Sequence, residues 1–556
     1  MFCTCLTRLS FAQNEPYPQD YFRSPINFPI VLAGNYGECR ANHFHAGLDI
    51  KTKGKENEVV VAAAEGYVSR IKMEPGGYGH ALYISHPNGY TTVYAHLNDF
   101  SPKIQKYLRQ QQYALKKWRV DLQIAADVLP VKKGEQIAKS GNTGGSSGPH
   151  LHWEIRDSKN EHPLNPLLFG IKINDTRPPK PTRIGVYKGN VSVYQQKPDI
   201  QNLKLKNELY QPDTDTIFVQ DNLMGLSIAV NDFMNGSSNT LSLHTAEWFL
   251  DDRPQGKIRI EEIGFDETRF IHAFADYSIK QTQNYWMTCL FKLPGNQLRQ
   301  VYENLNAHSG KLDLSDGQAH ELKIEIRDAF DNVSVIKCIV KGTKEPALTN
   351  TCDEIQTNNK RAIELPEVQI QLGNNVVYDK VCWEMKTKPE SGKAISNVYQ
   401  ILDANIPAHE RFTLRIKPTK SLSPEQKDKV VMAYSDGRST DREAAERSHD
   451  FYQARVRKFG NYWLETDTNP PSVSCNISNG TKVGSGQRIN FSVKEKETSI
   501  KSFDVWANGQ WLCFEQRGTN WFYNVEEHLP KGKIQLKAIA MDENGNKKTM
   551  HLNINR

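Results

Sequence analysis

Three short segments in the N-terminal third of the chain carry histidines and carboxylates. Their spacing could bring these side chains together for metal binding or proton transfer. They read HAGLD at residues 45–49, TVYAH at 92–96 and HLHWEIR at 150–156. Alternate side chains of an extended strand share one face. We therefore expect three strands, each with apolar residues toward a core and with histidine or carboxylate groups on the opposite face.

Two imidazoles and one carboxylate on such faces could hold a zinc ion. A zinc hydrolase uses three protein ligands and keeps a fourth position for water, whose pKa the metal lowers toward about 7. His45, Asp49 and one member of the pair His150 and His152 supply such a set. The other member and His96 are then left for proton transfer. No HExxH segment occurs, which excludes the metalloprotease plan with its glutamate on a helix.

The same segments belong to a longer ordered set that resembles the lysostaphin/LytM-type zinc endopeptidases, which cleave peptide bonds in bacterial cell-wall peptidoglycan. The resemblance covers about residues 30–170. Its segments run in the family's order: HAGLD at 45–49, GGYG at 76–79, YAHL at 94–97, Gly134 in a VKKG turn, GNTG at 141–144, GPHLHWE at 148–154 and PLNP at 163–166.

The resemblance implies a role for each of the five site residues. His45, Asp49 and His152 would bind Zn²⁺, and His96 and His150 would be the catalytic pair. It also implies a LytM-type antiparallel β-sheet domain, the duplicated hybrid motif, which we place at residues 25–172. Glu154 shares the face of the two histidines, and we expect it to support a ligand rather than to catalyse.

Because every motif position is occupied, we expect a zinc metalloendopeptidase that acts on the cross-links or stem peptides of peptidoglycan. Two other hypotheses stay open. The domain could be a catalytically silent LytM-type module that binds or regulates another cell-wall hydrolase, or it could be a zinc peptidase that acts on proteins.

About thirty residues between Leu97 and the VKKG turn depart from the family pattern, which has a short connection there. Ser101 and Pro102 form a helix-start signal, and apolar residues then follow one helical stripe among lysines and arginines. We expect a helical insertion at about 101–128. It could cover the edge of the sheet, or it could form a basic wall or lid over the groove.

The rest of the chain reads as a mainly β protein with several domains. The segments DTRPP at 175–179 and DTNPP at 467–471 suit stiff linkers, and alternation of apolar and polar residues between them is typical of half-buried strands. We expect β-sandwiches at 175–345, 363–466 and 467–556; the term Ig-like rests on resemblance to tandem modules of secreted bacterial proteins. Asp328 with Asp331, and Asp542 with Asn544, could bind calcium, or could only form Asp/Asn-rich turns.

Composition limits the partners and the location. The chain has 556 residues and a formal net charge of +6, which is mild for this length, so we expect no nucleic-acid partner. No run of about 18 apolar residues occurs, so no transmembrane helix is expected. Residues 1–12 resemble the tail of a secretory leader. We therefore expect export to the periplasm, the cell envelope or the medium, with peptidoglycan peptides and other envelope proteins as partners.

Overall fold

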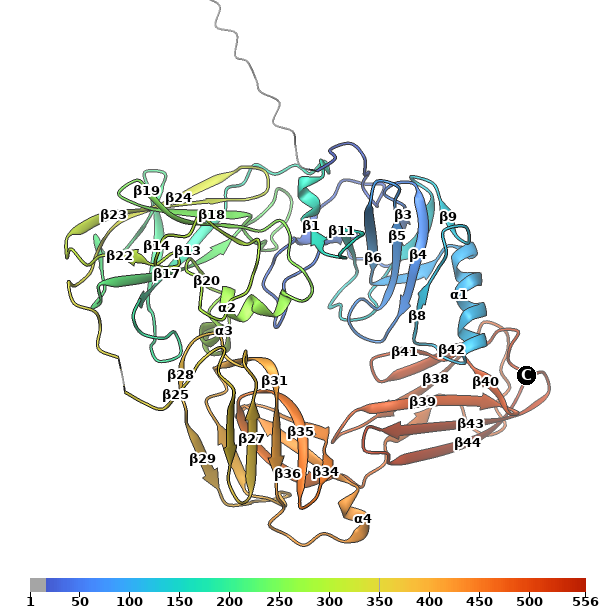
Figure 1. Ribbon diagram of the computed structural model, residues 1–556. Coiled ribbons are helices and arrows are strands. Elements are labelled where there is room, and N and C mark those ends of the chain that lie inside the picture. Colours follow the sequence, from blue (N-terminus) through green and yellow to red (C-terminus); the bar gives the residue numbers. More distant parts are fainter. Residues whose placement is uncertain (1–16, 350) are drawn as a thin grey trace, which may run out of the picture.

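The computed structural model describes residues 17–349 and 351–556, so the expected leader at 1–12 lies outside the described residues. The chain forms four β-rich units that follow one another around a ring, and the last unit lies beside helix α1 of the first (Figure 1). The expectation of a mainly β fold is confirmed. No helix among the described residues has the length and apolar character that a membrane crossing requires.

The first unit is built on one large antiparallel sheet with the strand order β1-β2-β11-β6-β5-β4-β8, to which β12 and β9 add at the sides. A small sheet with the order β3-β10-β7 completes it. The strands are β1 (Leu32–Gly34), β2 (Leu48–Lys51), β3 (Val59–Val61), β4 (Gly66–Met73), β5 (His80–Ser85), β6 (Tyr90–Ala95), β7 (Leu97–Phe100), β8 (Val120–Gln123), β9 (Pro130–Val131), β10 (Gln136–Ser140), β11 (His150–Asp157) and β12 (Pro163–Leu164), followed by the 3₁₀ helix η1 (Pro166–Leu168).

Apolar alternation sets the direction of the side chains in β11. Leu151, Trp153 and Ile155 are fully buried in the core of the unit, as the sequence predicts. His152 and Glu154 therefore project from the opposite face of the strand.

The inserted segment forms helix α1 (Pro102–Leu115) and strand β8. Pro102 occupies the first helical turn after Ser101, and Ile104 and Leu108 are buried in the core. Strand β8 pairs with β4 at the edge of the large sheet, with β4 and β5 between it and β6. The insertion therefore extends and covers a sheet edge, which is the first of the two interpretations that the sequence left open.

The second unit joins twelve strands by hydrogen bonds into one sheet whose two halves enclose a common core. Its strands are β13 (Lys180–Lys188), β14 (Asp199–Lys206), β15 (Leu209–Pro212), β16 (Thr216–Phe218), β17 (Leu223–Asn231), β18 (Thr245–Leu250), β19 (Arg253–Arg259), β20 (Thr288–Cys289), β21 (Tyr302–Glu303), β22 (Leu312–Asp313), β23 (Ala319–Arg327) and β24 (Val333–Lys341). Three short helices lie between β19 and β20: η2 (Thr268–Phe270), α2 (Ile271–Phe274) and α3 (Tyr277–Gln283).

The third unit has two five-stranded sheets that share one buried core, plus a two-stranded ribbon. Its elements are β25 (Glu354–Ile355), β26 (Arg361–Glu364), β27 (Val368–Leu372), β28 (Val381–Cys382), β29 (Met385–Lys388), β30 (Val398–Ile401), β31 (Pro407–Ile416), α4 (Pro424–Lys427), β32 (Val430–Ser435), β33 (Thr440–Ala444), β34 (Glu446–Ser448), β35 (Phe451–Lys458) and β36 (Gly460–Thr466). A disulfide joins Cys352 to Cys382 across the ribbon β25–β28.

The fourth unit has two four-stranded sheets around a separate core. Its strands are β37 (Ser472–Cys475), β38 (Arg488–Lys494), β39 (Ile500–Ala507), β40 (Gln510–Leu512), β41 (Glu515–Arg517), β42 (Asn520–Asn524), β43 (Lys533–Asp542) and β44 (Lys547–Asn555).

The fourth unit contacts the first unit at helix α1, and this contact completes the ring of units. The hydroxyl of Tyr113 donates to Oε1 of Glu526 at 2.9 Å, and its ring stacks on His528 with centroids 3.6 Å apart. Arg517 donates to the side chain of Asn98 at 2.9 Å. The side chains of Trp511 and Cys513 are buried in the core of the first unit.

Candidate metal centre

Strands β2 and β11 place two of the predicted ligands directly opposite each other. In their antiparallel register Asp49 pairs with His152, while Leu48 pairs with Trp153 on the core side. Oδ1 of Asp49 lies 3.0 Å from Nδ1 of His152. Side chains at directly opposed positions of an antiparallel pair point to the same face, so the apolar pattern of both strands also fixes this polar pair.

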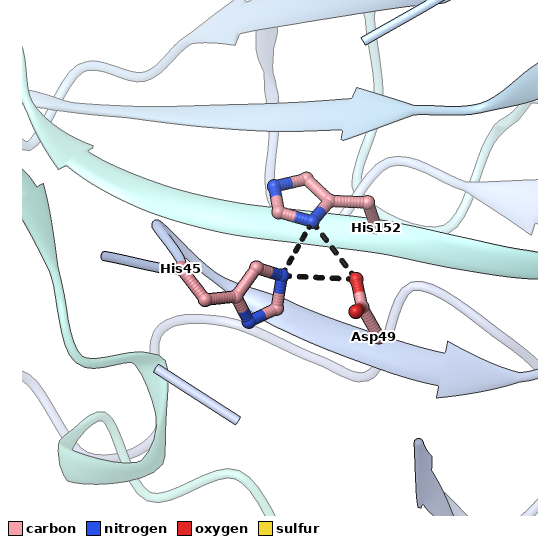
Figure 2. Close-up of side chains that lie close together, drawn as sticks. All are labelled: His45, Asp49 and His152. Atoms are coloured by element: carbon pink, nitrogen blue, oxygen red, sulfur yellow. Dashed lines mark hydrogen bonds and ion pairs between the residues drawn. The ribbon is translucent and has the colours of Figure 1, made fainter. Parts of the chain in front are cut away.

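His45 reaches the same point from a loop. The expectation that residues 45–49 form one strand was wrong at its start, because β2 begins at Leu48. The backbone of His45 bonds to Gly37 and Glu38, and this pairing joins its loop to the loop that follows β1. Its Nε2 lies 3.0 Å from Oδ1 of Asp49 and 3.0 Å from Nδ1 of His152, as Figure 2 shows.

Each of the two imidazoles is oriented by an acceptor behind it. Nδ1 of His45 lies 2.7 Å from the carbonyl of Asn35, and Nε2 of His152 lies 2.8 Å from Oε1 of Glu154. Because a carbonyl and a carboxylate only accept, these two ring nitrogens carry hydrogen. Nε2 of His45 and Nδ1 of His152 are therefore the nitrogens left to face Asp49.

Glu154 is fully buried between His152 and Arg156. Its Oε2 accepts from Nε of Arg156 at 2.6 Å. Burial alone would raise the pKa of Glu154, but the Arg156 charge and the His152 bond lower that pKa to about 2. The ionised carboxylate is thus a fixed acceptor for His152, the supporting role that the sequence predicts for it.

Charge at the site also shifts the pKa values of two of the predicted ligands, His152 and Asp49. Burial would lower the pKa of His152, but its bonds to Asp49 and Glu154 raise that pKa to about 9. Burial would likewise raise the pKa of Asp49, whereas the three histidines around it hold that pKa well below its usual range. A metal that binds Nδ1 of His152 at neutral pH therefore displaces a proton.

His96 and His150 lie beside this triad. Their ring centroids are 4.7 Å apart, and Nε2 of His150 lies 3.3 Å from Oδ1 of Asp49. Nδ1 of His96 lies 2.8 Å from the carbonyl of Thr143, and Nδ1 of His150 lies 2.8 Å from that of Gly148. The glycine-rich loop at 141–148 therefore orients both histidines through its backbone carbonyls.

His96 reaches the site through an unusual backbone. Strand β6 ends at Ala95, and His96 has a φ of 58°, which is uncommon for a residue other than glycine. Tyr94, opposite Trp153, lies in the core, so regular alternation would carry the next residue but one to the core as well. The expectation that regular strand alternation presents His96 on the face opposite the core was wrong, because the left-handed turn redirects His96.

The ring of His96 is neutral at physiological pH. Burial lowers its pKa to about 3, and the neighbouring rings of His152 and His150 add to that shift. Since Nδ1 is bonded to the Thr143 carbonyl, Nε2 is the nitrogen that can accept a proton.

Two further residues, Arg40 and Tyr78, contact the triad or the residues beside it. Arg40 donates from Nη2 to Oδ2 of Asp49 at 2.9 Å and so holds a ligand in place. Tyr78, inside the quoted GGYG segment, has its ring centroid 5.4 Å from that of His152, and its hydroxyl accepts from Arg156 at 3.3 Å. The position of Tyr78 in a motif was its only sequence signal.

The three facing atoms fit a zinc ion. Nε2 of His45, Oδ1 of Asp49 and Nδ1 of His152 form a triangle with sides of 3.0 Å, which is compatible with bonds of about 2.0–2.2 Å from one ion to all three. The donor set of two imidazoles and a carboxylate is the set that catalytic zinc sites use. The acceptors behind both imidazoles are the outer partners that metal-binding histidines have.

Comparison with known proteins gives two family matches. The model described as "Peptidase family M23" matches residues 43–113 and 125–166, and that described as "Zu5-like domain" matches residues 353–467. The stretch that the first match omits, 114–124, holds the end of α1 and all of β8.

Curated relatives match the first unit. An uncharacterized metalloprotease of Haemophilus influenzae is 34% identical over 28% of this chain and 28% of its own length. The DD-carboxypeptidase/endopeptidase Mpg of Neisseria gonorrhoeae is 35% identical over 23% of each chain. The murein hydrolase activator NlpD of Escherichia coli is 34% identical over 22% of this chain and 25% of its own. The chain thus spans about a quarter of the length of these relatives.

Among solved structures, the catalytic domain of lysostaphin from Staphylococcus simulans is 21% identical, over 24% of this chain and 87% of that one, with a TM-score of 0.18.

Proposed function

The chain contains a Peptidase family M23 domain, and from that premise we propose that the protein is a zinc-dependent endopeptidase that hydrolyses peptide bonds in peptidoglycan. The observation that carries the proposal is the convergence of five side chains on one point: three ligand atoms in a 3.0 Å triangle and two oriented histidines beside them. A binding module without chemistry has no need for His96 and His150.

Each residue has a distinct task in this proposal. His45, Asp49 and His152 would hold the zinc ion, which when bound supplies a Lewis acid and lowers the pKa of water. His96, neutral and with Nε2 free to accept, would take the proton from the attacking water. His150, whose Nδ1 donates to the Gly148 carbonyl, would in its protonated form donate a hydrogen bond from Nε2 to the oxygen that gains charge at the scissile carbonyl.

Location and accessory roles extend the proposal. The relatives include proteins named for peptidoglycan or murein processing, and we propose that this chain acts in the cell envelope after export. The units at 175–345, 363–466 and 467–556, proposed as Ig-like sandwiches, would then position the peptidase domain or contact other envelope proteins.

The deciding experiment is digestion of purified peptidoglycan with analysis of the products, carried out with and without a chelator and after zinc is added back. New free amines and carboxyl termini that disappear with the chelator would support the endopeptidase and identify the bond. The matched control is the His152→Ala variant, which should give no products.

A second candidate function is regulation of another hydrolase. The match to a protein named as a murein hydrolase activator, at 34% identity, favours it. Intact peptidoglycan after incubation with protein that holds one zinc per chain would argue for this role and against the first.

A further inference from the structure

Three aspartates from separate segments meet where the chain passes from the first unit to the second. Asp175 lies in the linker, Asp232 directly follows β17, and Asp328 directly follows β23. One carboxylate oxygen from each lies within 4.8 Å of one oxygen from each of the others. Calcium binds oxygen at about 2.3–2.6 Å, so one ion between these carboxylates could contact all three.

Asp232 has one carboxylate oxygen, Oδ1, that the described part of the protein does not satisfy. Only 2% of this residue is exposed, and its Oδ1 is buried without a hydrogen-bond partner among the described residues. No lysine or arginine in the described part of the chain forms an ion pair with any of the three aspartates. The nearby guanidinium of Arg177 donates instead to the carbonyls of Met234 and Ser237, at 3.2 Å each.

The raised pKa of Asp232 also indicates that the cluster lacks a compensating positive charge. Burial and the neighbouring carboxylates of Asp328 and Asp175 raise the pKa of Asp232 to about 7. Buried charges in proteins are paired or coordinate a metal, because an uncompensated one costs several kcal/mol. A cation among the three carboxylates removes this cost.

The fourth unit offers an internal comparison in which the same turn occurs with two carboxylates. Asn546 donates to Oδ2 of Asp542 at 2.9 Å and to the carbonyl of Asp467 at 3.0 Å. In the second unit Asn332 donates in the same way to Asp328 at 2.7 Å and to the carbonyl of Asp175 at 3.4 Å.

The two sites differ in their third member. In the fourth unit a hydroxyl approaches, since Thr498 donates to Oδ2 of Asp467 at 3.4 Å. In the second unit the third member is the carboxylate of Asp232. Asp/Asn turn geometry therefore accounts for Asp328 and Asp542 alike, but it does not account for Asp232.

We propose that Asp175, Asp232 and Asp328 form a calcium-binding site at the junction of the first two units. Three carboxylates in an all-oxygen setting suit a hard cation, and the flexible coordination of calcium tolerates donors from three separate segments. The cluster contains no imidazole or thiolate, which distinguishes it from the zinc site.

The position of the site indicates what the ion does. The loop that begins at Asp232 carries Met234 into the core of the first unit, where its sulfur lies 3.0 Å from the backbone nitrogen of Leu32. Ser237 in the same loop bonds to the carbonyl of Leu32 and accepts from Lys51. Calcium would fix this loop, and through it the second unit, on strands β1 and β2 of the peptidase domain.

The test is calcium binding by the full chain loaded with zinc. Titration calorimetry with CaCl₂ should show one saturable site, with an affinity no weaker than the about 10⁻⁴–10⁻³ M that is typical of extracellular modules. The thermal unfolding midpoint should rise in calcium. No heat of binding and no rise in the midpoint up to 10-fold above that range would overturn the proposal.

Two variants separate the site from diffuse attraction of calcium to acidic groups. Asp232→Asn keeps the shape of the side chain and should lose calcium binding at least 10-fold, while its midpoint without calcium stays at or above that of the wild type, because the unpaired charge is gone. Asp331→Asn removes a nearby exposed carboxylate and should leave the affinity within about twofold. Equal losses in the two variants, or full binding by Asp232→Asn, would refute the assignment.

Discussion

Asp49 stands directly opposite His152 in the register of β2 and β11, with Oδ1 3.0 Å from Nδ1. The same register pairs Leu48 with Trp153 in the core. A slip of one residue would bury the polar pair and expose the apolar one. Core packing and ligand alignment are therefore set by one hydrogen-bonding pattern.

Removal of His152 should abolish zinc binding. The change His152→Ala deletes one of three ligand atoms and leaves the buried carboxylate of Glu154 with Arg156 as its remaining partner. Metal analysis of the dialysed protein should show less than one tenth of the wild-type zinc. His43→Ala, an exposed histidine two residues from His45, is the control and should keep its zinc. Full zinc content in His152→Ala would refute the ligand assignment.

Removal of His96 should separate metal binding from turnover. His96→Ala should retain one zinc per chain, because the ligand triangle does not include His96. Its rate of peptidoglycan hydrolysis should fall by about 10²–10⁴-fold, the usual contribution of a general base. A wild-type rate in this variant would remove His96 from the mechanism.

The carboxylate behind His152 should control zinc affinity. Glu154→Gln removes the charge that orients His152, and outer partners of this kind contribute about 10–100-fold to metal affinity. Competition with a chelator of known affinity measures the change. Glu161→Gln is the matched control, since Glu161 also contacts Arg156, at 3.4 Å, but is exposed. Equal zinc affinities in these two variants would contradict the role of Glu154.

The contacts of Tyr113 should keep the fourth unit in place against the first. Tyr113→Ala removes the bond to Glu526 and the stacking on His528. We expect a larger radius of gyration in X-ray scattering and faster proteolysis in the linker at 467–471. Leu115→Ala alters an exposed side chain at the end of the same helix and should change neither. An unchanged radius in Tyr113→Ala would show that other contacts suffice.

Acid should destabilise the peptidase domain through His86. Burial lowers the pKa of its imidazole to about 4, against about 6.5 in an unfolded chain. Between these values the unfolded chain binds a proton that the folded chain does not, so stability falls as the pH drops from about 6.5 toward 4. The expected loss between pH 7 and pH 5 is about 2 kcal/mol.

Urea unfolding of the wild type and of His86→Gln at both pH values measures the contribution of His86 to this loss of stability. The variant should lose about 2 kcal/mol less than the wild type over that range. The same pH dependence in both proteins would exclude His86 as the source.

The side-chain pattern of the sequence predicted much of the candidate site. The parts that it did not predict depend on backbone conformation and backbone carbonyl groups. Alternation in HLHWEIR places Trp153 in the core and His152 opposite it, as the structure has them. The same alternation did not predict the direction of His96, because the left-handed φ of 58° at this residue breaks the regular strand geometry. The acceptors behind His45 and His96 are the backbone carbonyls of Asn35 and Thr143, and a carbonyl carries no signature in the sequence.

The sequence also did not predict contacts between distant segments. The Ser101-Pro102 signal and the apolar stripe predicted α1, whose bounds are Pro102–Leu115. Nothing local indicates that Tyr113 of this helix meets Glu526, 413 positions away. The approach of Asp232 to Asp328 is likewise a product of packing between loops.

The contact between α1 and the fourth unit sets an order of events during synthesis. Trp511 and Cys513 lie in the core of the first unit, so that core is complete only after residues 511–513 have been synthesised. A truncated chain that ends before residue 467 lacks Trp511, Glu526 and His528 and leaves the face of α1 around Tyr113 uncovered. Final packing of the first unit is therefore tied to synthesis of the fourth unit.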